Sequence, residues 1–247
     1  MYQEFAQVYD LLMESVDYKA WADHYLRLLA QAGIAPGAKI TECACGTGGL
    51  TVHLARHHRM TGVDLSQEML SIAADKLRAA GHQVPLIRQD MQQLQLHTRQ
   101  DAILCTCDGV NYLTSPEALT RFLKAAHAAL RPGGVLAFDV STPYKLKHLL
   151  GNSSLSRLED PVHYIWQNCW DEHAQQVAMR LHLYAREADG RYRLLVEDQL
   201  QQAWTRQQLE AALTHAGFSQ IHAYGERTLR PPADTDQRMH LIALKPN

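Results

Sequence analysis

The strongest chemical signal lies in a small-residue loop within residues 40–50, Ile-Thr-Glu-Cys-Ala-Cys-Gly-Thr-Gly-Gly-Leu. A strand-like segment precedes the loop and a helix-like segment follows it, and open α/β sheets bind their ligands at such junctions. Gly46 and Gly48 permit backbone conformations closed to other residues, so a ligand can approach the main chain. The spacing is not that of a dinucleotide fingerprint, because Thr51 stands where the third glycine belongs, and no Gly-Lys-Ser/Thr completes a phosphate loop.

Two carboxylates flank this loop along the chain. Glu42 precedes it, where a negative charge would repel a pyrophosphate but would suit an ammonium group. Asp64 ends the next strand-like segment, about 20 residues further on, where a carboxylate can accept hydrogen bonds from the hydroxyls of a ribose. A ligand with a ribose, a cationic amino-acid end and no phosphate fits this pattern, and S-adenosylmethionine (SAM) is such a ligand.

Strand-like and helix-like segments must alternate to position these residues. The first 35 residues predict helix, and apolar segments predict strands at 38–44, 60–64, 84–88, 101–107 and 135–140. Helices are predicted at 50–57, after Ser66 and after Ser115, the last ending at residues 131–134. This alternation is typical of right-handed βαβ units and of a parallel sheet covered on both faces.

The alternation stops after Val140. Strands predicted at 162–170, 176–186 and 191–203, with an Asp189-Gly190 turn, indicate an antiparallel insertion. Thr205 and Gln208 fit a capping box for one more helix, and 218–224 and 239–244 would be closing strands. We therefore expect an α/β fold with a Rossmann-like seven-stranded sheet, a core of residues 1–142 plus 204–247, and an antiparallel β insertion over residues 143–203 that caps the substrate side.

Composition narrows the class of partner. The 247 residues carry 24 Lys and Arg against 26 Asp and Glu, a formal net charge of −2, which disfavours nucleic acid as the main partner. No apolar run reaches the length of a membrane span, and the start of the chain lacks the features of a signal peptide, so we expect no membrane partner and a cytoplasmic location. A small-molecule substrate fits best, and a homodimer is left open.

The five cysteines raise two alternatives. An odd number on strand-like segments argues against a disulfide framework. Cys43, Cys45, Cys105 and Cys107 form two Cys-x-Cys pairs, and four thiolates would suit zinc. The spacing is not the usual Cys-x₂-Cys, and cysteine is often a small buried residue, so we predict no metal.

Three motifs resemble those of the class I SAM-dependent methyltransferases. They are Glu42-x-Ala44-x-Gly46-x-Gly48, Asp64-Leu65-Ser66-x-x-Met69-Leu70 and Gln89-Asp90-Met91, with Ala44 where glycine is usual. Further segments are similar to the YqeM-like methyltransferases over nearly the whole chain: Phe5-Ala6-x-x-Tyr9-Asp10, Cys107–Leu113, Phe138-Asp139-Val140-x-x-x-Tyr144-Lys145 and Tyr164-Ile165-Trp166. The pattern from Tyr2 to Asp10 is also similar to that of dimethylating amino-sugar methyltransferases.

The resemblance implies roles for individual residues. Those expected at the cofactor are Tyr9, Glu42, Ala44, Cys45, Gly46, Thr47, Gly48, Asp64, Leu65, Met69, Asp90, Met91 and Cys107. Those expected on the substrate side are Asp108, Asn111, Tyr112, Asp139 and Tyr144, none of them assigned as a base. Taken singly, Asp64 fits a helix N-terminus, Asp90 a turn, Tyr9 a helix core face, and Asp139 a cap on the loop after the fifth strand.

The function implied is transfer of a methyl group from SAM to a small molecule. In such an in-line displacement the protein mainly aligns the nucleophile with the methyl group and excludes water. The alternatives are methylation of tRNA or protein, and a SAM-binding module without turnover.

Overall fold

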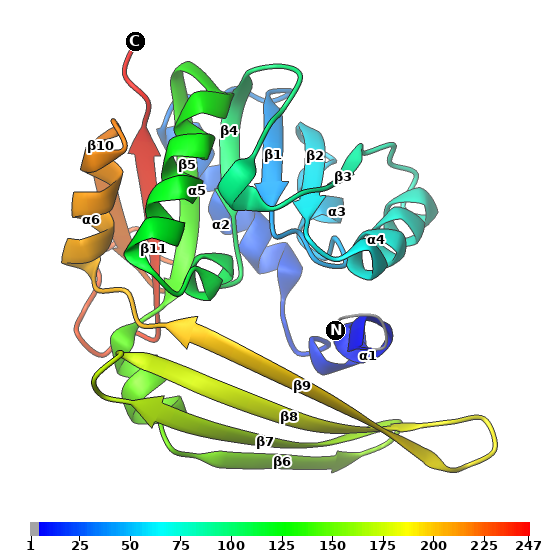
Figure 1. The fold of residues 1–247 in the computed structure, drawn as a ribbon. Coiled ribbons are helices and arrows are strands. Elements are labelled where there is room, and N and C mark those ends of the chain that lie inside the picture. The colour runs from blue at the N-terminus through cyan, green and yellow to red at the C-terminus, as the bar shows by residue number, and fades with distance from the viewer. Residues whose placement is uncertain (1–4) are drawn as a thin grey trace.

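The protein, described here from a computed structural model over residues 5–247, contains two β-sheets (Figure 1). The larger sheet has the order β10-β11-β5-β4-β1-β2-β3. Its strands are β1 (Lys39–Cys43), β2 (Arg59–Asp64), β3 (Leu86–Arg88), β4 (Gln100–Cys105), β5 (Leu130–Ser141), β10 (Ser219–Gly225) and β11 (Arg238–Leu244). The first five are parallel, and β11 runs antiparallel to both β5 and β10. The predicted seven-stranded Rossmann-like sheet is thus confirmed.

Helices cover both faces of this sheet. Helices α2 (Tyr18–Gln31) and α3 (Thr51–Leu54) pack on one face through a core that includes Tyr25 and Leu28. Helices α5 (Pro116–Ala129) and α6 (Arg206–His215) pack on the other through a core that includes Phe122 and Leu213. Helix α4 (Gln67–Ala79) contacts β2 and β3. The predicted caps Ser66, Ser115 and Thr205 each accept a hydrogen bond from a backbone amide of the helix that follows.

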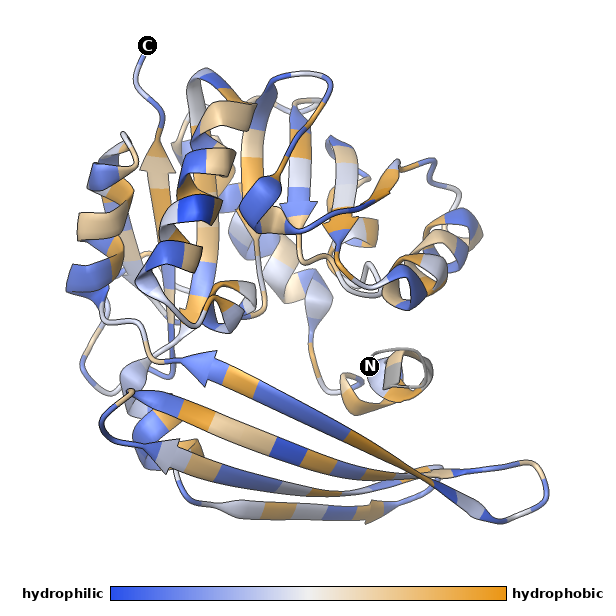
Figure 2. Ribbon diagram, viewed as in Figure 1, coloured by the Kyte–Doolittle hydropathy of each residue, from blue (hydrophilic) through white to orange (hydrophobic). Residues whose placement is uncertain are grey.

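The four-stranded sheet lies below the carboxyl ends of the parallel strands and is antiparallel throughout. Its strands are β6 (Ser154–Glu159), β7 (Val162–Asp171), β8 (Gln176–Arg186) and β9 (Tyr192–Gln202). Burial alternates along β8, where Val177, Met179, Leu181 and Leu183 are buried, and the alternation of hydropathy along these strands is visible in Figure 2. All four strands fall within residues 143–203, and the division of the chain at 142 and 204 stays a prediction.

Several predicted elements differ from the structure. Residues 5–35 contain two helices, α1 (Phe5–Leu12) and α2, because Asp17 caps the start of α2 by accepting a hydrogen bond from the Ala20 amide at 2.9 Å. The helix predicted at 50–57 is only the single turn of α3, and β5 begins before residues 131–134 rather than after them. Strand β6 was not predicted, because Leu155 and Leu158 are three residues apart and lack the two-residue period of a strand, and most of its side chains are exposed at the sheet edge.

Three short helices connect these elements. They are η1 (Met91–Gln93), η2 (Gly109–Tyr112) and the π-helical turn η3 (Lys145–Leu150). Within residues 5–247 no helix combines the length and the apolar character that a membrane span requires.

Candidate active site

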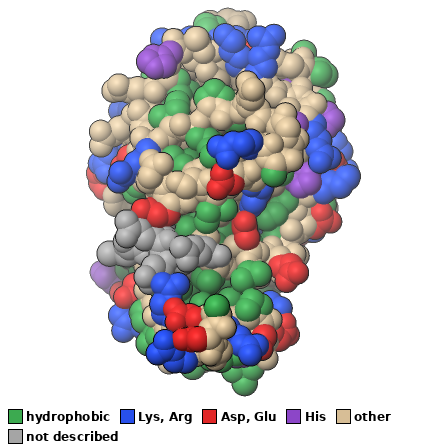
Figure 3. Space-filling model, turned by 90° about the vertical axis from the view of Figure 1, so that its right-hand side faces the viewer, with side chains coloured by type: hydrophobic (Ala, Val, Ile, Leu, Met, Phe, Trp, Pro, Cys, Tyr) green, Lys and Arg blue, Asp and Glu red, His purple; other side chains and the backbone are tan. Residues whose placement is uncertain are grey.

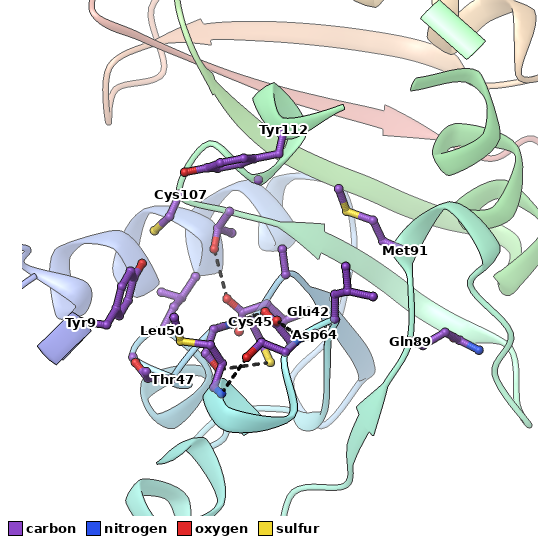
Figure 4. Close-up of a pocket in the computed structure, with 18 of the residues that line it drawn as sticks. Tyr9, Glu42, Cys45, Thr47, Leu50, Asp64, Gln89, Met91, Cys107 and Tyr112 are labelled. Atoms are coloured by element: carbon purple, nitrogen blue, oxygen red, sulfur yellow. Dashed lines mark hydrogen bonds between the residues drawn. The ribbon is translucent and has the colours of Figure 1, made fainter. Parts of the chain in front are cut away.

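A cavity of about 290 Å³ opens at the carboxyl ends of β1, β2 and β4, and residues of α1 and β9 complete its lining. Figure 4 shows most of the residues that line it. Twelve of the thirteen predicted cofactor residues line it: Tyr9, Glu42, Ala44, Cys45, Gly46, Thr47, Asp64, Leu65, Met69, Asp90, Met91 and Cys107. Gly48 is not among its lining residues. It has a φ of +73°, and an added Cβ would lie 3.2 Å from the Cβ of Ala73, so Gly48 lets the loop pack on α4.

Asp64 fastens the small-residue loop to the end of β2. Its carboxylate accepts hydrogen bonds from the Gly46 amide at 2.8 Å and from the Ser66 amide at 2.9 Å. Burial raises the pKa of this carboxyl, while these amides oppose the shift. Asp64 therefore fixes the backbone at the start of α4 and also lines the cavity. Ala44 adopts a φ of +52°, the left-handed region that favours glycine, which is the residue that the resemblance leads us to expect at this position.

Glu42 is an almost fully buried carboxyl group at the floor of the cavity, with 2% of its surface exposed. It accepts hydrogen bonds from the hydroxyls of Thr51 at 2.6 Å and Thr106 at 3.1 Å. Burial raises its pKa to about 7, against the effect of the two hydroxyls. No basic side chain of the described chain forms an ion pair with it, so an ammonium group of a ligand would complete its environment.

The opposite side of the cavity is formed by the segment after β3. Figure 4 shows Gln89 and Met91 there, across from Tyr9. Asp90 accepts a hydrogen bond from the Gln92 amide at 2.9 Å and so caps η1. Asp90 is thus a turn residue and a cavity residue at the same time.

Helix α1 closes the cavity from the N-terminal side. Tyr9 lines the cavity and also packs against the core of the four-stranded sheet, as a residue on a helix core face would, and its contact with the cofactor stays a prediction. Asp10 ties α1 to the loop, because its carboxylate accepts hydrogen bonds from the Thr47 hydroxyl at 2.6 Å and from the Lys76 ammonium at 2.9 Å. Residue Tyr2 of the opening pattern lies outside the described residues.

Of the five substrate-side candidates, Tyr112 alone is among the residues that line the cavity. Its hydroxyl donates to Gln199 Oε1 of β9 at 2.9 Å, which joins the two sheets across the cavity wall. Asn111 is fully buried and bridges the backbone of Ser141 to the carbonyl of Gln202. Tyr144 packs beside His148, with ring centroids 5.6 Å apart. Asn111 therefore holds the junction between the two sheets.

Asp139 lies behind the cavity wall rather than in it. Its side chain is fully buried, and its carboxylate accepts hydrogen bonds from the amides of Cys107 at 2.8 Å and Asp108 at 3.0 Å. It therefore caps the loop after β4, the fourth strand, and not the loop after its own strand as the sequence suggested. Asp108 in turn accepts from the Gln201 amide group at 2.8 Å and pairs with Arg238 at 2.9 Å.

The sequence did not identify ten of the lining residues: Tyr18, Gly49, Leu50, Ser66, Gln89, Gln92, Thr106, Gly109, Leu113 and Gln199. Ser66 and Gln89 stand inside motifs that had been recognised, so their proximity was a usable signal. Gln199 comes from the edge strand of the insertion, where nothing local in the sequence specifies which face meets the cavity.

The Cys-x-Cys pairs meet through strand pairing, since Cys43 and Cys105 are neighbours in the register of β1 and β4. All five cysteines are free thiols. Burial raises the pKa of Cys105 and of Cys107 well above its ordinary value, which keeps both protonated. In the part of the chain that the structure describes, no group of three or more His, Cys, Asp or Glu side chains is arranged to hold a metal ion.

Comparison with known proteins agrees with this geometry. A family model described as a methyltransferase domain matches residues 40–134. A protein of Geobacillus sp. (strain WCH70) is 31% identical over 99% of both chains, and YqeM of Bacillus subtilis (strain 168) is 30% identical over 99% of this chain and 97% of its own. Both are named as methyltransferases, with no acceptor stated.

Solved structures extend the similarity to the complete fold. A SAM-dependent methyltransferase of Clostridium acetobutylicum ATCC 824 superposes with a TM-score of 0.90 at 30% identity, covering 100% of this chain and 99% of its own. A sugar N-methyltransferase of Streptoalloteichus sp. ATCC 53650 shares the fold at 24% identity and a TM-score of 0.78, over 97% of this chain and 93% of its own. The chain therefore belongs to the class I SAM-dependent methyltransferases, in the group that includes YqeM, and its cofactor is SAM.

Proposed function

We propose that this methyltransferase acts on the nitrogen of a small-molecule amine. The observation that carries the proposal is the absence of a general base among the described residues on the acceptor side of the cavity. Apart from the predicted cofactor residues, to which Tyr9 belongs, the cavity lining includes Tyr18, Tyr112, Leu113 and Gln199. The carboxylates that line the cavity, Glu42, Asp64 and Asp90, all belong to the cofactor motifs, and no His, Lys or Arg is among the described lining residues.

An amine needs no base at the moment of transfer. SAM supplies a methyl group on a sulfonium, which is already a good leaving group. The lone pair of a neutral amine forms the new C–N bond while the C–S bond breaks. The electron pair of the broken C–S bond stays on sulfur. The resulting alkylammonium then releases a proton to water. An alcohol would need its proton removed during transfer. Burial raises the pKa of Tyr9 and of Tyr18, so neither phenol is ionised near neutral pH.

The cavity wall has a second property that favours an amine. Tyr9, Tyr18 and Tyr112 line the cavity, so their aromatic rings would surround the positive charge that passes from sulfur to nitrogen. A cation against an aromatic face gains on the order of 0.5–2 kcal/mol. The chain's own contribution to the reaction is therefore to align the acceptor and to exclude water. It also surrounds the positive charge, first on the sulfonium and then on the alkylammonium.

Structural neighbours support a small amine over a macromolecule. Besides the sugar N-methyltransferase, an amino pentose methyltransferase of Micromonospora echinaspora shares the fold at 21% identity and a TM-score of 0.75, over 96% of both chains. On the face drawn in Figure 3, acidic side chains are interspersed with basic ones. An RNA-binding surface would instead be expected to show a continuous basic field.

Chemical blocking of amines in a metabolite extract tests the proposal. The protein is incubated with methyl-labelled SAM and two halves of one small-molecule extract, one of them treated beforehand with an acylating reagent that caps primary and secondary amines. We expect labelled product only from the untreated half. Mixing the two halves controls for inhibition by the reagent. Label that persists after blocking, or that appears only when RNA or protein is supplied, contradicts an amine acceptor.

A further inference from the structure

The loop between β4 and η2 carries an unusual backbone. Cys107 and Asp108 are consecutive non-glycine residues with φ of +54° and +55°. Each such residue costs free energy, and the conformation persists only where the surroundings hold it in place. Cys107 lines the cavity, and the next residues, Gly109 and Tyr112, line it as well. The strained segment thus forms a wall of the site.

A single buried carboxylate holds both strained residues. The Cys107 amide donates to one oxygen of Asp139 at 2.8 Å, and the Asp108 amide donates to the other at 3.0 Å. The Tyr25 hydroxyl also donates to Asp139, at 3.1 Å. Since Asp139 has no exposed surface, water cannot replace these contacts, and the loop conformation depends on this side chain remaining in place.

Arg238 of β11 makes a charge at Asp139 tolerable in this buried position. Its guanidinium donates to Asp139, pairs with Asp108 at 2.9 Å, and lies over the ring of Trp21 at 5.0 Å. Asp108 also accepts from Gln201 of β9 at 2.8 Å. The ion pair therefore joins the loop to the large sheet on one side and to the insertion on the other.

The loop has little freedom to settle elsewhere. A Cβ on Gly109 would come within 2.8 Å of the Cys105 sulfur and 3.2 Å of the Ala44 Cβ, so the backbone is already in close contact with the strand ends. We propose that Asp139 and Arg238 are positioning residues for methyl transfer. They fix the Cys107–Tyr112 wall against the acceptor without touching the cofactor or the acceptor. This inference rests on the methyltransferase activity and not on the acceptor being an amine.

The test compares Arg238→Met, Arg238→Lys and Asp139→Asn with the unchanged protein. Arg180→Met is the matched control, because it removes another Arg–Asp pair, Arg180–Asp198 at 2.6 Å, which is exposed on the insertion sheet. Three quantities are measured: amide hydrogen exchange of residues 106–113 with S-adenosylhomocysteine (SAH) bound, SAH affinity by calorimetry, and transfer of labelled methyl from SAM into an untreated cell extract.

For Arg238→Met and Asp139→Asn we expect exchange at 106–113 to accelerate by about 10-fold or more and methyl transfer to fall by about 10-fold or more, with SAH affinity changed less than about 3-fold. Arg238→Lys should recover part of the transfer, since it restores the charge, and Arg180→Met should match the unchanged protein.

Three outcomes would overturn the proposal. These are unchanged exchange at 106–113, transfer retained despite faster exchange, and SAH affinity lost in parallel with transfer. If Asp139→Asn fails to fold, the two Arg238 variants decide the question. A labelled product that is not an amine would contradict the proposed function and leave this result intact.

Discussion

The two ends of the cavity are built in different ways. The end that carries the cofactor motifs comes from three strand-end segments at residues 42–48, 64–69 and 89–92, each close to a parallel strand. The other end combines Tyr18 of α2, Tyr112 of η2 and Gln199 of β9, residues that are far apart in the chain. The first end depends on the regular geometry of a parallel sheet, while the second depends on how the four-stranded sheet packs against it. Binding of cofactor and choice of acceptor should therefore respond to different substitutions.

The largest effect is expected from Asp64→Ala. Its carboxylate holds the loop through the Gly46 amide, and the resemblance predicts that it also accepts from ribose hydroxyls. Loss of two charge-assisted hydrogen bonds costs on the order of 3 kcal/mol, so SAH affinity in calorimetry should fall roughly 100-fold. Asp75→Ala removes an exposed carboxylate on α4 and is the control. Equal affinity of Asp64→Ala and the unchanged protein would show that this end does not bind the cofactor.

Glu42→Gln should have the next largest effect, roughly a 10-fold loss of SAH affinity near neutral pH. Because the pKa of Glu42 is about 7 in the free protein, an ammonium that binds beside it should lower this pKa. At pH 6 the unchanged protein should then release up to about one proton on binding SAH, measured by calorimetry in buffers of different ionisation enthalpy. Glu42→Gln should release none. Identical proton release by both proteins would remove Glu42 from the cofactor site.

The same residue makes a prediction for stability without cofactor. The folded-state pKa of about 7 lies above the ordinary value of 4.5, so the folded chain holds an extra proton between these values. The contribution of Glu42 to stability is full below pH 4.5 and is lost as the pH rises through 7. Urea unfolding should show the unchanged protein losing on the order of 2 kcal/mol relative to Glu42→Gln between pH 5 and pH 8. A constant difference between the two proteins would contradict the raised pKa.

A smaller effect, confined to the acceptor end, is expected from Gln199→Ala. It removes the partner of the Tyr112 hydroxyl, so the wall between the two sheets loosens. Methyl transfer into an extract should fall roughly 5-fold, about 1 kcal/mol, with SAH affinity unchanged. Gln167→Ala, on the opposite face of the insertion, is the control. A parallel loss of SAH affinity would show that the two ends are not separable in this way.

Asp10→Asn should have the smallest effect. It weakens the contacts from α1 to Thr47 and Lys76, which are partly exposed, so we expect roughly a 2- to 3-fold loss of SAH affinity. Raised salt should reduce the difference between the variant and the unchanged protein. A loss as large as that of Asp64→Ala would make α1 part of the cofactor end.

The difference between the ends also explains what the sequence could predict. Local sequence is enough to predict Asp64, Ser66 and the glycine loop, because a strand, a turn and a helix cap follow each other within a few residues. The same holds for the Thr205–Gln208 capping box and for the turn between β8 and β9. The sequence predicted Asp139 and Asn111 as substrate-side residues. Their hydrogen-bond partners lie 30 or more residues away in the chain, and both side chains hold backbone segments instead of lining the cavity. Gln199 could not be found, since its position depends on how the insertion docks.

One contact described earlier has a practical meaning. A Cβ at Gly109 would lie 3.2 Å from the Cβ of Ala44, so the loop after β1 and the loop after β4 touch with no room between them. Redesign of the enzyme for new acceptors should therefore leave these two loops unchanged and vary Gln199 of β9, which lines the cavity and belongs to neither loop. The insertion is the natural place for a laboratory to diversify this protein.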